Sequence, residues 1–240
     1  MRRLILFDID GTLLATDGAG RRAFERCLHA AFGRTGPIGT YDFHGKTDPQ
    51  IVYDLLEHEG IPRLEVEAAL PAFWRAYGVA LAEELEVSRD RGGVRPLPGV
   101  APLLDHLDAR GDLVLALLTG NVETGARLKL SVAGLGERFR FGAYGSDSAV
   151  RTELPAVAFQ RARDHTGIEF TGRDAVVVGD TPEDVACARV CGALGVAVAT
   201  GRHDVAALQA AGADLVLENL QDLERAARVL CDGAGMRRAL

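Results

Sequence analysis

Short apolar segments alternate with amphipathic segments over most of the chain. Apolar residues recur at helical spacing over 100–107, 154–162 and 220–230. The purely apolar segments have the length and composition of strands that are buried on both faces. They cover residues 4–7, 113–118, 175–178 and 194–199, with weaker candidates at 140–144 and 214–217. This order predicts an α/β fold, a Rossmann-like parallel sheet flanked by helices.

The stretch from residue 16 to residue 91 interrupts that alternation. It contains no convincing strand, and its apolar residues predict three helices, over 24–31, 51–56 and 66–85. The sequence Arg-Asp-Arg-Gly-Gly at 89–93 is typical of a hinge. We therefore predict two domains, an α/β core of residues 1–15 and 92–240 and an all-helical insertion of residues 16–91. The tail that begins at Asp232 is expected to fray.

Charge and hydropathy argue against several classes of protein. The formal net charge of −7 disfavours a nucleic-acid binder, because such proteins neutralise phosphates with basic residues. No apolar run approaches the roughly 20 residues that a membrane-spanning helix needs. Asp8 and Asp10 cut the apolar N-terminal segment too short for a secretory signal. We expect a cytoplasmic protein, monomeric or homodimeric, that acts on a small molecule and binds neither nucleic acid nor membrane.

The four cysteines form no Cys-x-x-Cys pair and no disulfide framework. Cys187 and Cys191 are four residues apart, which places them on one face of a predicted helix, and no histidine pair lies nearby to complete a metal site. We expect both to be buried structural thiols in a reducing compartment.

Two carboxylates follow the first predicted strand directly. Asp8 and Asp10 are two positions apart and leave the strand end on the same side. Because burying them without a partner is costly, the pair indicates a bound cation or a catalytic task. Gly11 permits a sharp turn, and Thr12 offers a hydroxyl and an amide. A calcium loop is excluded, because such a loop needs Gly at position 6 and Glu at position 12, where this chain has Ala19.

A second acidic cluster follows the strand predicted at 175–178. Asp180 stands at its end, Pro182 suits the start of the next helix, and Asp184 falls in the first turn, where its charge suits the helix dipole. Alone, the cluster is equally well explained as an ordinary helix start. Because the carboxyl ends of parallel strands meet at one edge of a sheet, the two clusters together predict a site for a hard cation such as Mg²⁺.

The triplet Thr119-Gly120-Asn121 follows the strand predicted at 113–118. A strand that runs into a helix presents free amides to an anion, and Thr119 adds a hydroxyl. On its own the triplet is also a common turn. Three strand ends therefore carry, in chain order, an aspartate typical of a nucleophile, a threonine and an aspartate typical of a metal ligand.

With these three motifs the chain resembles the haloacid dehalogenase superfamily of hydrolases, and most closely its phosphatases. The family's DxDGT motif is present at 8–12, its threonine is Thr119, and its GDxxxD motif is present at 179–184. The resemblance covers essentially the whole chain. It implies that the helical insertion is a cap that closes over the site, and the insertion's motifs look somewhat like those of phosphoglycolate phosphatases.

The resemblance implies a role for each motif residue. Asp8 would attack phosphorus and form an aspartyl-phosphate, and Asp10 would protonate the leaving oxygen and then activate water. The Mg²⁺ cofactor would be held by the Asp8 carboxylate, the Asp10 backbone carbonyl and Asp180, with Asp184 as a ligand or a support. The phosphate-binding residues would be Gly11, Thr12, Thr119, Gly120 and Asn121.

The family's cationic residue is the part of the pattern that this sequence matches least. The family often has Lys-Pro before the helix that precedes the GDxxxD strand, and the matching segment here is Arg-Thr-Glu-Leu-Pro at 151–155. Arg151 and Lys129 are therefore both candidates for the positive charge near Asp8. We favour Lys129, because Arg151 is equally well explained as a surface residue beside Asp147.

The loop at 44–48 offers a second cluster, within the insertion. Its sequence His-Gly-Lys-Thr-Asp permits close approach of the backbone, and Lys46 and His44 would bind an anionic group of the substrate. The alternative is a plain loop in which Thr47 or Asp48 caps the next helix. Arg21, at the predicted hinge into the insertion, is a further candidate contact.

These features predict a Mg²⁺-dependent hydrolase that removes phosphate from a small phosphomonoester, such as a phosphoglycolate-like ester. Alternatives on the same fold are a sugar-phosphate mutase, which needs the same aspartate pair, a phosphonatase with Lys46 as Schiff base, and a haloalkanoate dehalogenase. Asp10 argues against the last two. A noncatalytic phosphate-binding regulator is a rival from another class, and the presence of both Asp8 and Asp10 disfavours it.

Overall fold

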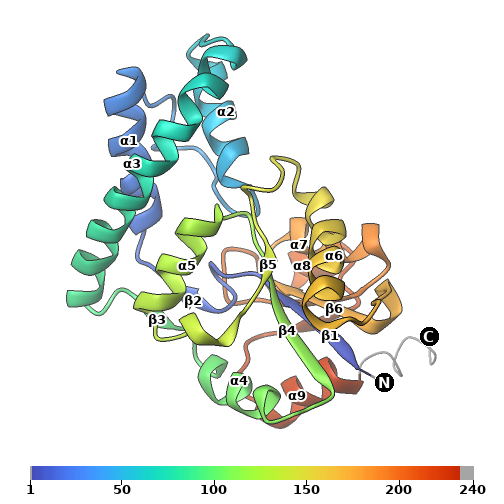
Figure 1. The fold of residues 1–240 in the computed structure, drawn as a ribbon. Coiled ribbons are helices and arrows are strands. Elements are labelled where there is room, and N and C mark those ends of the chain that lie inside the picture. Colours follow the sequence, from blue (N-terminus) through green and yellow to red (C-terminus); the bar gives the residue numbers. More distant parts are fainter. Residues whose placement is uncertain (1, 233–240) are drawn as a thin grey trace.

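The computed structural model describes residues 2–232. Six strands in this part of the chain form one parallel sheet in the order β5-β4-β1-β6-β7-β8 (Figure 1). The predicted parallel sheet is thus confirmed, and the first strand lies inside it rather than at an edge. The strands are β1 (Arg3–Phe7), β4 (Leu113–Leu118), β5 (Gly142–Ala143), β6 (Ala175–Gly179), β7 (Leu194–Val198) and β8 (Leu215–Leu217).

Helices cover both faces of the sheet, as predicted. Successive side chains of a strand point to opposite faces, so Ile5 and Phe7 pack with α4, α5 and α9, whereas Leu4 and Leu6 pack with α6 and α7. The strand β1 is a continuous apolar run for this reason. The helices are α4 (Val100–Asp108), α5 (Glu123–Val132), α6 (Leu154–Thr166), α7 (Pro182–Cys191), α8 (Val205–Ala210) and α9 (Leu223–Asp232).

The segment 16–91 folds into the three predicted helices, α1 (Ala19–Phe32), α2 (Asp48–His58) and α3 (Arg63–Asp90). They lie beyond the carboxyl ends of the strands (Figure 1). They enclose an apolar cluster to which Val122 of the α/β part also contributes, and in which the ring centroid of Phe24 lies 4.6 Å from that of Tyr77 and 6.0 Å from that of Phe73. The boundaries of a separate cap domain stay a prediction.

The chain enters and leaves the insertion side by side. Two short strands that the sequence did not predict, β2 (Leu14–Ala15) and β3 (Arg95–Pro96), pair antiparallel at this point. The helix α3 continues to Asp90, so only 91–93 of the predicted hinge lies outside a helix. The hinge prediction was therefore too long at its start.

Three other sequence predictions need correction. The strand expected at 140–144 is reduced to the two residues of β5. The helix predicted over 220–230 begins only at Leu223. Leu220 lies in the loop before α9, and its side chain, 1% exposed, makes an apolar contact from that loop. Cys187 is buried as expected, whereas Cys191 is only partly buried. The expected fraying beyond Asp232 lies outside the described residues.

Across residues 2–232, no helix is both long enough and apolar enough to cross a membrane.

Candidate active site

Three neighbouring strands end at the candidate site. The strand β1 leads into Asp8 and pairs on one side with β4, which leads into Thr119, and on the other with β6, which leads toward Asp180. The backbone N–H of Asp8 continues the ladder by donating to Val178 O at 2.9 Å. The order of strands therefore places Asp8 between the other two motifs, which the sequence could not show.

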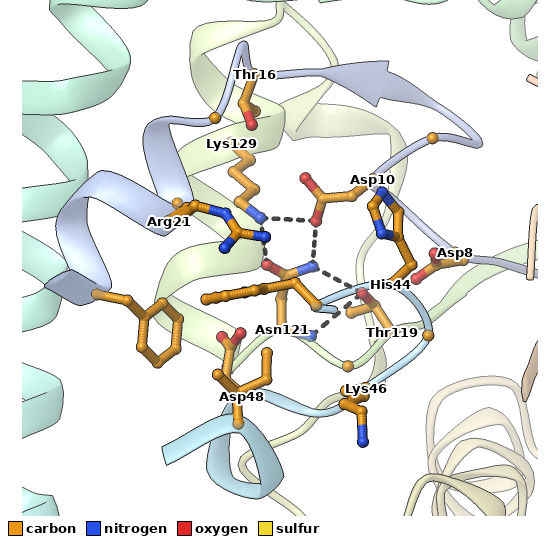
Figure 2. A pocket seen from close by; sticks show the side chains of 18 of the residues that line it. Asp8, Asp10, Thr16, Arg21, His44, Lys46, Asp48, Thr119, Asn121 and Lys129 are labelled. Carbon is orange, nitrogen blue, oxygen red and sulfur yellow. Dashed lines mark hydrogen bonds and ion pairs between the residues drawn. The ribbon is translucent and has the colours of Figure 1, made fainter. Parts of the chain in front are cut away.

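A cavity of about 310 Å³ opens between this sheet edge and the insertion (Figure 2). Thr12, Asp180 and Asp184 are buried next to the cavity without lining it. The cavity brings together most of the residues predicted from the sequence: Asp8, Asp10, Gly11, Lys46, Thr119, Gly120, Asn121, Lys129 and Arg151. The insertion adds Arg21, Phe24, Phe43, His44, Asp48, Ile51 and Tyr77.

Three buried carboxylates gather at the floor of the site. One oxygen from each of Asp8, Asp180 and Asp184 lies within 4.8 Å of the others. Burial raises the pKa of Asp8 to about 6, although the positive charge of Arg151 acts in the opposite direction. Burial also raises the pKa of Asp180 well above its usual value, and the nearby carboxylates add to this. One guanidinium is too little positive charge for three carboxylates.

Two oxygens of this cluster are candidates for metal ligands. Both are buried: Asp180 Oδ2 accepts no hydrogen bond from any described residue, and Asp8 Oδ1 has only the ion pair with Arg151 Nη2 at 3.1 Å. The other oxygen of Asp180 accepts a hydrogen bond from Thr12 Oγ1 at 3.0 Å, so the Thr12 hydroxyl faces Asp180 and not the cavity. Because buried carboxylate oxygens rarely stay unpartnered and hard divalent cations prefer such ligands, the pair fits a divalent metal.

Asp184 is occupied differently. Its Oδ1 accepts a hydrogen bond from Arg151 Nη2 at 2.5 Å, and its Oδ2 accepts from the backbone N–H and the hydroxyl of Thr181 at 3.0 and 2.7 Å. Thr181 and Asp184 form a capping box at the start of α7. Both Asp184 oxygens are thus engaged by protein groups, and the carboxylate fixes Arg151, whose Nη2 lies 3.1 Å from Asp8 Oδ1.

Two glycines let the backbone approach Asp180 closely. A Cβ atom on Gly11 would lie 2.4 Å from Asp180 Oδ2, and a Cβ on Gly201 would lie 1.7 Å from the same atom. The neighbouring Thr200 hydroxyl donates to Gly11 O at 2.6 Å. Gly201 was not predicted from the sequence, where its only signal is a glycine shortly after a predicted strand.

A second cation lies in a separate network. Lys129 Nζ lies 2.6 Å from both Asp10 Oδ2 and Asn121 Oδ1. Asn121 Nδ2 in turn donates to Asp10 Oδ2 at 2.7 Å and to Thr119 Oγ1 at 2.9 Å (Figure 2). The side chain of Asp10 is 41% exposed, so it stays accessible from the cavity. This network joins Asp10 to the loop predicted to bind phosphate.

The two candidate cations therefore contact different carboxylates, Lys129 that of Asp10 and Arg151 that of Asp8. The interpretation of Arg151 as a surface residue is wrong, because its side chain is only 6% exposed. Asp147, its expected neighbour, pairs with Arg161 at 2.7 Å. The reason for favouring Lys129 over Arg151 as the charge beside Asp8 is thereby removed.

The insertion touches the sheet edge through Asp48. Its backbone N–H donates to Gly120 O at 2.7 Å, and its Oδ2 accepts from the backbone N–H of Val122, the N-cap residue of α5, also at 2.7 Å. Burial raises the pKa of Asp48 to about 7, against the effect of nearby Lys129. The sequence identified Asp48 as a candidate cap only for α2, the helix in which it lies. Its side chain instead accepts a hydrogen bond from Val122 N, at the start of α5.

Both interpretations of the 44–48 loop describe part of what is seen. Thr47 caps α2 by accepting from Gln50 N at 3.3 Å, as the plain-loop alternative proposed. Lys46 lines the cavity as well, with Nζ 3.1 Å from Asp54 Oδ2. His44 also lines the cavity. The loop is thus both a helix start and a wall of the site.

Residues 5–189 match the family model of the haloacid dehalogenase-like hydrolases. The chain is 31% identical over 228 residues to phosphoglycolate phosphatase 1 of Pseudomonas aeruginosa. The matched region covers 92% of this chain and 78% of that protein. It is 26% identical to a phosphoglycolate phosphatase of Rhodospirillum rubrum, over 88% of this chain and 86% of that one.

Solved structures show the same fold. A hydrolase from Pseudomonas syringae superposes with a TM-score of 0.68 at 24% identity, over 94% of this chain and 97% of that one. CbbY from Rhodobacter sphaeroides in complex with phosphate superposes with a TM-score of 0.62 at 21% identity, over 93% of this chain and 96% of that one. At these identities the likeness concerns the fold alone.

Proposed function

The chain belongs to the haloacid dehalogenase-like hydrolases and is a phosphoric monoester hydrolase of that type, and from this premise we propose a Mg²⁺-dependent phosphatase that acts on a small phosphomonoester through an aspartyl-phosphate on Asp8. The observation that carries the proposal is the position of Asp8, between Thr119 and Asp180 and on the wall of the cavity. A cytoplasmic location and a monomeric or homodimeric state stay predictions.

Asp8 acts as the nucleophile. Its carboxylate attacks the phosphorus of the ester, so that a bond from phosphorus to Asp8 forms while the bond from phosphorus to the ester oxygen breaks. Arg151 is the cation beside this carboxylate, at 3.1 Å, and its buried Nε has no partner among the described residues. That donor is available to an oxygen of the transferred phosphoryl group. Thr119 and the amides of Gly120 and Asn121 bind further phosphate oxygens.

Asp10 acts as the acid and then as the base. It gives a proton to the leaving oxygen in the first step, and in the second it takes a proton from the water that attacks the aspartyl-phosphate. Lys129 and Asn121 hold its Oδ2 from two sides, at 2.6 and 2.7 Å. This arrangement fixes Asp10 beside the leaving group and explains why the site contains two cations.

The residues that would hold Mg²⁺ are Asp180, through its unpartnered Oδ2, and Asp8, with the backbone carbonyl of Asp10. Asp184 supports them by fixing Arg151. When bound, the ion supplies positive charge that offsets repulsion between the carboxylates and the phosphate. An acceptor on Asp180 without a hydrogen bond from the described residues, together with an excess of buried negative charge, is what supports a metal here.

The insertion acts as a cap with its own domain boundaries, residues 16–91. It lines the cavity with Phe24, Phe43 and Tyr77 and limits the access of bulk solvent to the reacting groups. The cavity of about 310 Å³ suits a small ester and not a macromolecule. A phosphoglycolate-like ester is the candidate substrate, because the curated relatives carry that activity in their names.

The test is the release of inorganic phosphate from a panel of small esters, with Mg²⁺ and with a chelator, using Asp8→Asn as the control. We expect release that needs Mg²⁺ and is lost in Asp8→Asn, whose side chain keeps its shape but loses its charge. Release that persists in Asp8→Asn contradicts the nucleophile, and no release from any ester by the unaltered enzyme contradicts the proposed function.

A further inference from the structure

Four arginine and lysine side chains line the cavity, and three of them are paired with carboxylates. Lys129 pairs with Asp10, Arg151 with Asp8 and Asp184, and Lys46 with Asp54, at distances from 2.5 to 3.1 Å. The fourth is Arg21, which makes no ion pair with any carboxylate of residues 2–232. The insertion therefore brings one uncompensated positive charge to the cavity.

The guanidinium of Arg21 is nevertheless held in place. Arg21 lies in the first turn of α1, and its Nη1 and Nη2 donate to the backbone carbonyls of Ile38 and Tyr41, the second at 2.9 Å. Its Cζ lies 4.2 Å from the ring centroid of Phe43. Carbonyl oxygens and an aromatic face orient the group without cancelling its charge. Orientation of this kind is what a binding group needs before its ligand arrives.

Arg21 also has donors to spare and faces the reacting groups. A guanidinium has five N–H donors, and the two described hydrogen bonds use two of them. Figure 2 shows the side chain reaching from α1 toward Lys129 and Asn121. The adjacent Gly20 confirms this closeness, since a Cβ there would lie 3.7 Å from Lys129 Nζ.

We propose that Arg21 binds a second anionic group of the substrate, a carboxylate, which makes the preferred substrate a short phosphate ester with a carboxylate a few bonds from the ester oxygen. The proposal rests on the proposed function, since it assumes that the phosphate group is bound at Asp8 and Thr119. A planar guanidinium and a carboxylate match in two parallel hydrogen bonds. The phosphate has its own cation in Arg151.

This assignment differs from the expectation for Lys46. Both residues line the cavity, but Lys46 already has Asp54 at 3.1 Å, so binding a substrate anion there would compete with an existing ion pair. Arg21 has no such competitor among the described residues. Arg21 is therefore the residue of the insertion that determines specificity.

The experiment compares matched esters with and without the second anion. The esters are phosphoglycolate, ethyl phosphate, which has the same length but no carboxylate, and ethylene glycol bisphosphate, in which a second phosphate replaces it. The variants are Arg21→Gln and Arg21→Lys. The matched control is Arg26→Gln, which alters an exposed arginine of the same helix that pairs with Glu83 and Glu84 and does not line the cavity.

We expect Arg21→Gln to lower kcat/KM for phosphoglycolate about 100-fold, the usual worth of hydrogen bonds to a charged group, mostly through KM. For ethyl phosphate the loss should stay within about 3-fold, because that ester lacks the group that Arg21 binds. Arg21→Lys keeps the positive charge but loses the planar pair of donors. Its kcat/KM for phosphoglycolate should lie between those of the unaltered enzyme and Arg21→Gln. Arg26→Gln should not change the preference between the esters.

The failures are distinguishable. If the unaltered enzyme hydrolyses ethyl phosphate as well as phosphoglycolate, or if Arg21→Gln lowers both equally while its melting temperature is unchanged, the inference is wrong and the phosphatase proposal stands. If the preference that depends on Arg21 is for the bisphosphate, the carboxylate assignment is wrong. If no ester releases phosphate, the proposed function itself fails.

Discussion

The sheet edge and the insertion form two walls of one cavity by different means. At the sheet edge, charged side chains hold one another, as Lys129 holds Asp10 and Arg151 holds Asp8. On the insertion side the aromatic residues Phe24 and Tyr77 line the cavity as part of an apolar cluster, and polar groups such as Arg21 stand beside them. The residues that we propose to carry out the reaction are thus fixed by ion pairs with one another, whereas those that we propose to select the substrate project from a segment packed through apolar contacts.

The comparison has a functional consequence. Substitutions at the sheet edge should slow the transfer of the phosphoryl group or of the proton to the leaving oxygen, whatever the rest of the ester carries. Substitutions in the insertion should change which ester is preferred, because the contacts there involve the part of the substrate that differs. The predictions that follow test this division, beginning with the largest effect.

The roles of the two cations at the sheet edge, Lys129 and Arg151, should be distinguishable by comparing esters with different leaving groups. Arg151→Met should lower kcat/KM about 1,000-fold for both ethyl phosphate and p-nitrophenyl phosphate, because charge stabilisation at phosphorus is common to both. Lys129→Met, which frees Asp10, should lower kcat/KM strongly for ethyl phosphate and far less for p-nitrophenyl phosphate, since nitrophenolate leaves without a proton. Steady-state rates of phosphate release measure both.

If Lys129→Met affects both esters equally, Lys129 does not act through the acid, and the division of the two cations between Asp8 and Asp10 is wrong. If Arg151→Met keeps near-normal rates, Arg151 is not the cation of the transferred group.

The next effect concerns the metal site alone. Gly201→Ala places a methyl group where Asp180 Oδ2 lies, with a Cβ only 1.7 Å from it. Asp180 must move, and displacement of a ligand's support typically costs about 10-fold to 100-fold in metal affinity. The Mg²⁺ concentration for half-maximal phosphate release should therefore rise by about that factor.

Gly111→Ala is the matched control, because a Cβ there meets no atom within 4 Å and its φ is not positive. If the Mg²⁺ concentration for half-maximal phosphate release is unchanged in Gly201→Ala, Asp180 is not a ligand of the metal.

The smallest effect tests the contact between the two walls. Burial raises the pKa of Asp48 to about 7, above its value of 3.8 in an unfolded chain. The folded state therefore loses stability as the pH rises from about 4 to about 7, because ionisation is easier in the unfolded state. Asp48→Asn removes this cost and keeps an acceptor for Val122 N, so its gain in unfolding free energy should be roughly 1–2 kcal/mol larger at pH 8 than at pH 5.

Denaturant unfolding at the two pH values measures the difference. Asp112→Asn is the matched control, and its effect should not differ between the two pH values, since the hydrogen bond from Arg110 lowers the pKa of Asp112 and this carboxyl is ionised at both. If the gain in unfolding free energy for Asp48→Asn does not depend on pH, the pKa of Asp48 is not raised by burial.

The sequence predicted the features that depend on neighbouring residues along the chain. Leu4 to Phe7 read as a strand because burial on both faces requires a continuous apolar run. Asp8, Thr119 and Asp180 stood out because each follows such a run, and parallel strands bring their carboxyl ends to one edge. The fold and the set of motif residues at the cavity followed from these local patterns.

Features that depend on packing between distant segments were not predictable. Arg151 looked like a surface residue, and only the turn that places it against Asp184 makes it buried. Gly201 has no local signature, since its role is the space it leaves for Asp180. That Arg21 has no carboxylate partner within residues 2–232 is equally a property of the assembled cavity.

The most direct test of the account is to trap the phosphorylated enzyme. The protein is mixed with p-nitrophenyl phosphate and Mg²⁺, quenched in acid within milliseconds, reduced with borohydride and analysed by mass spectrometry of its peptides. The account predicts conversion of residue 8 from aspartate to homoserine, with a larger converted fraction in Asp10→Asn, where the base for hydrolysis is missing. Phosphate release in the same samples without any modification at Asp8 would contradict it.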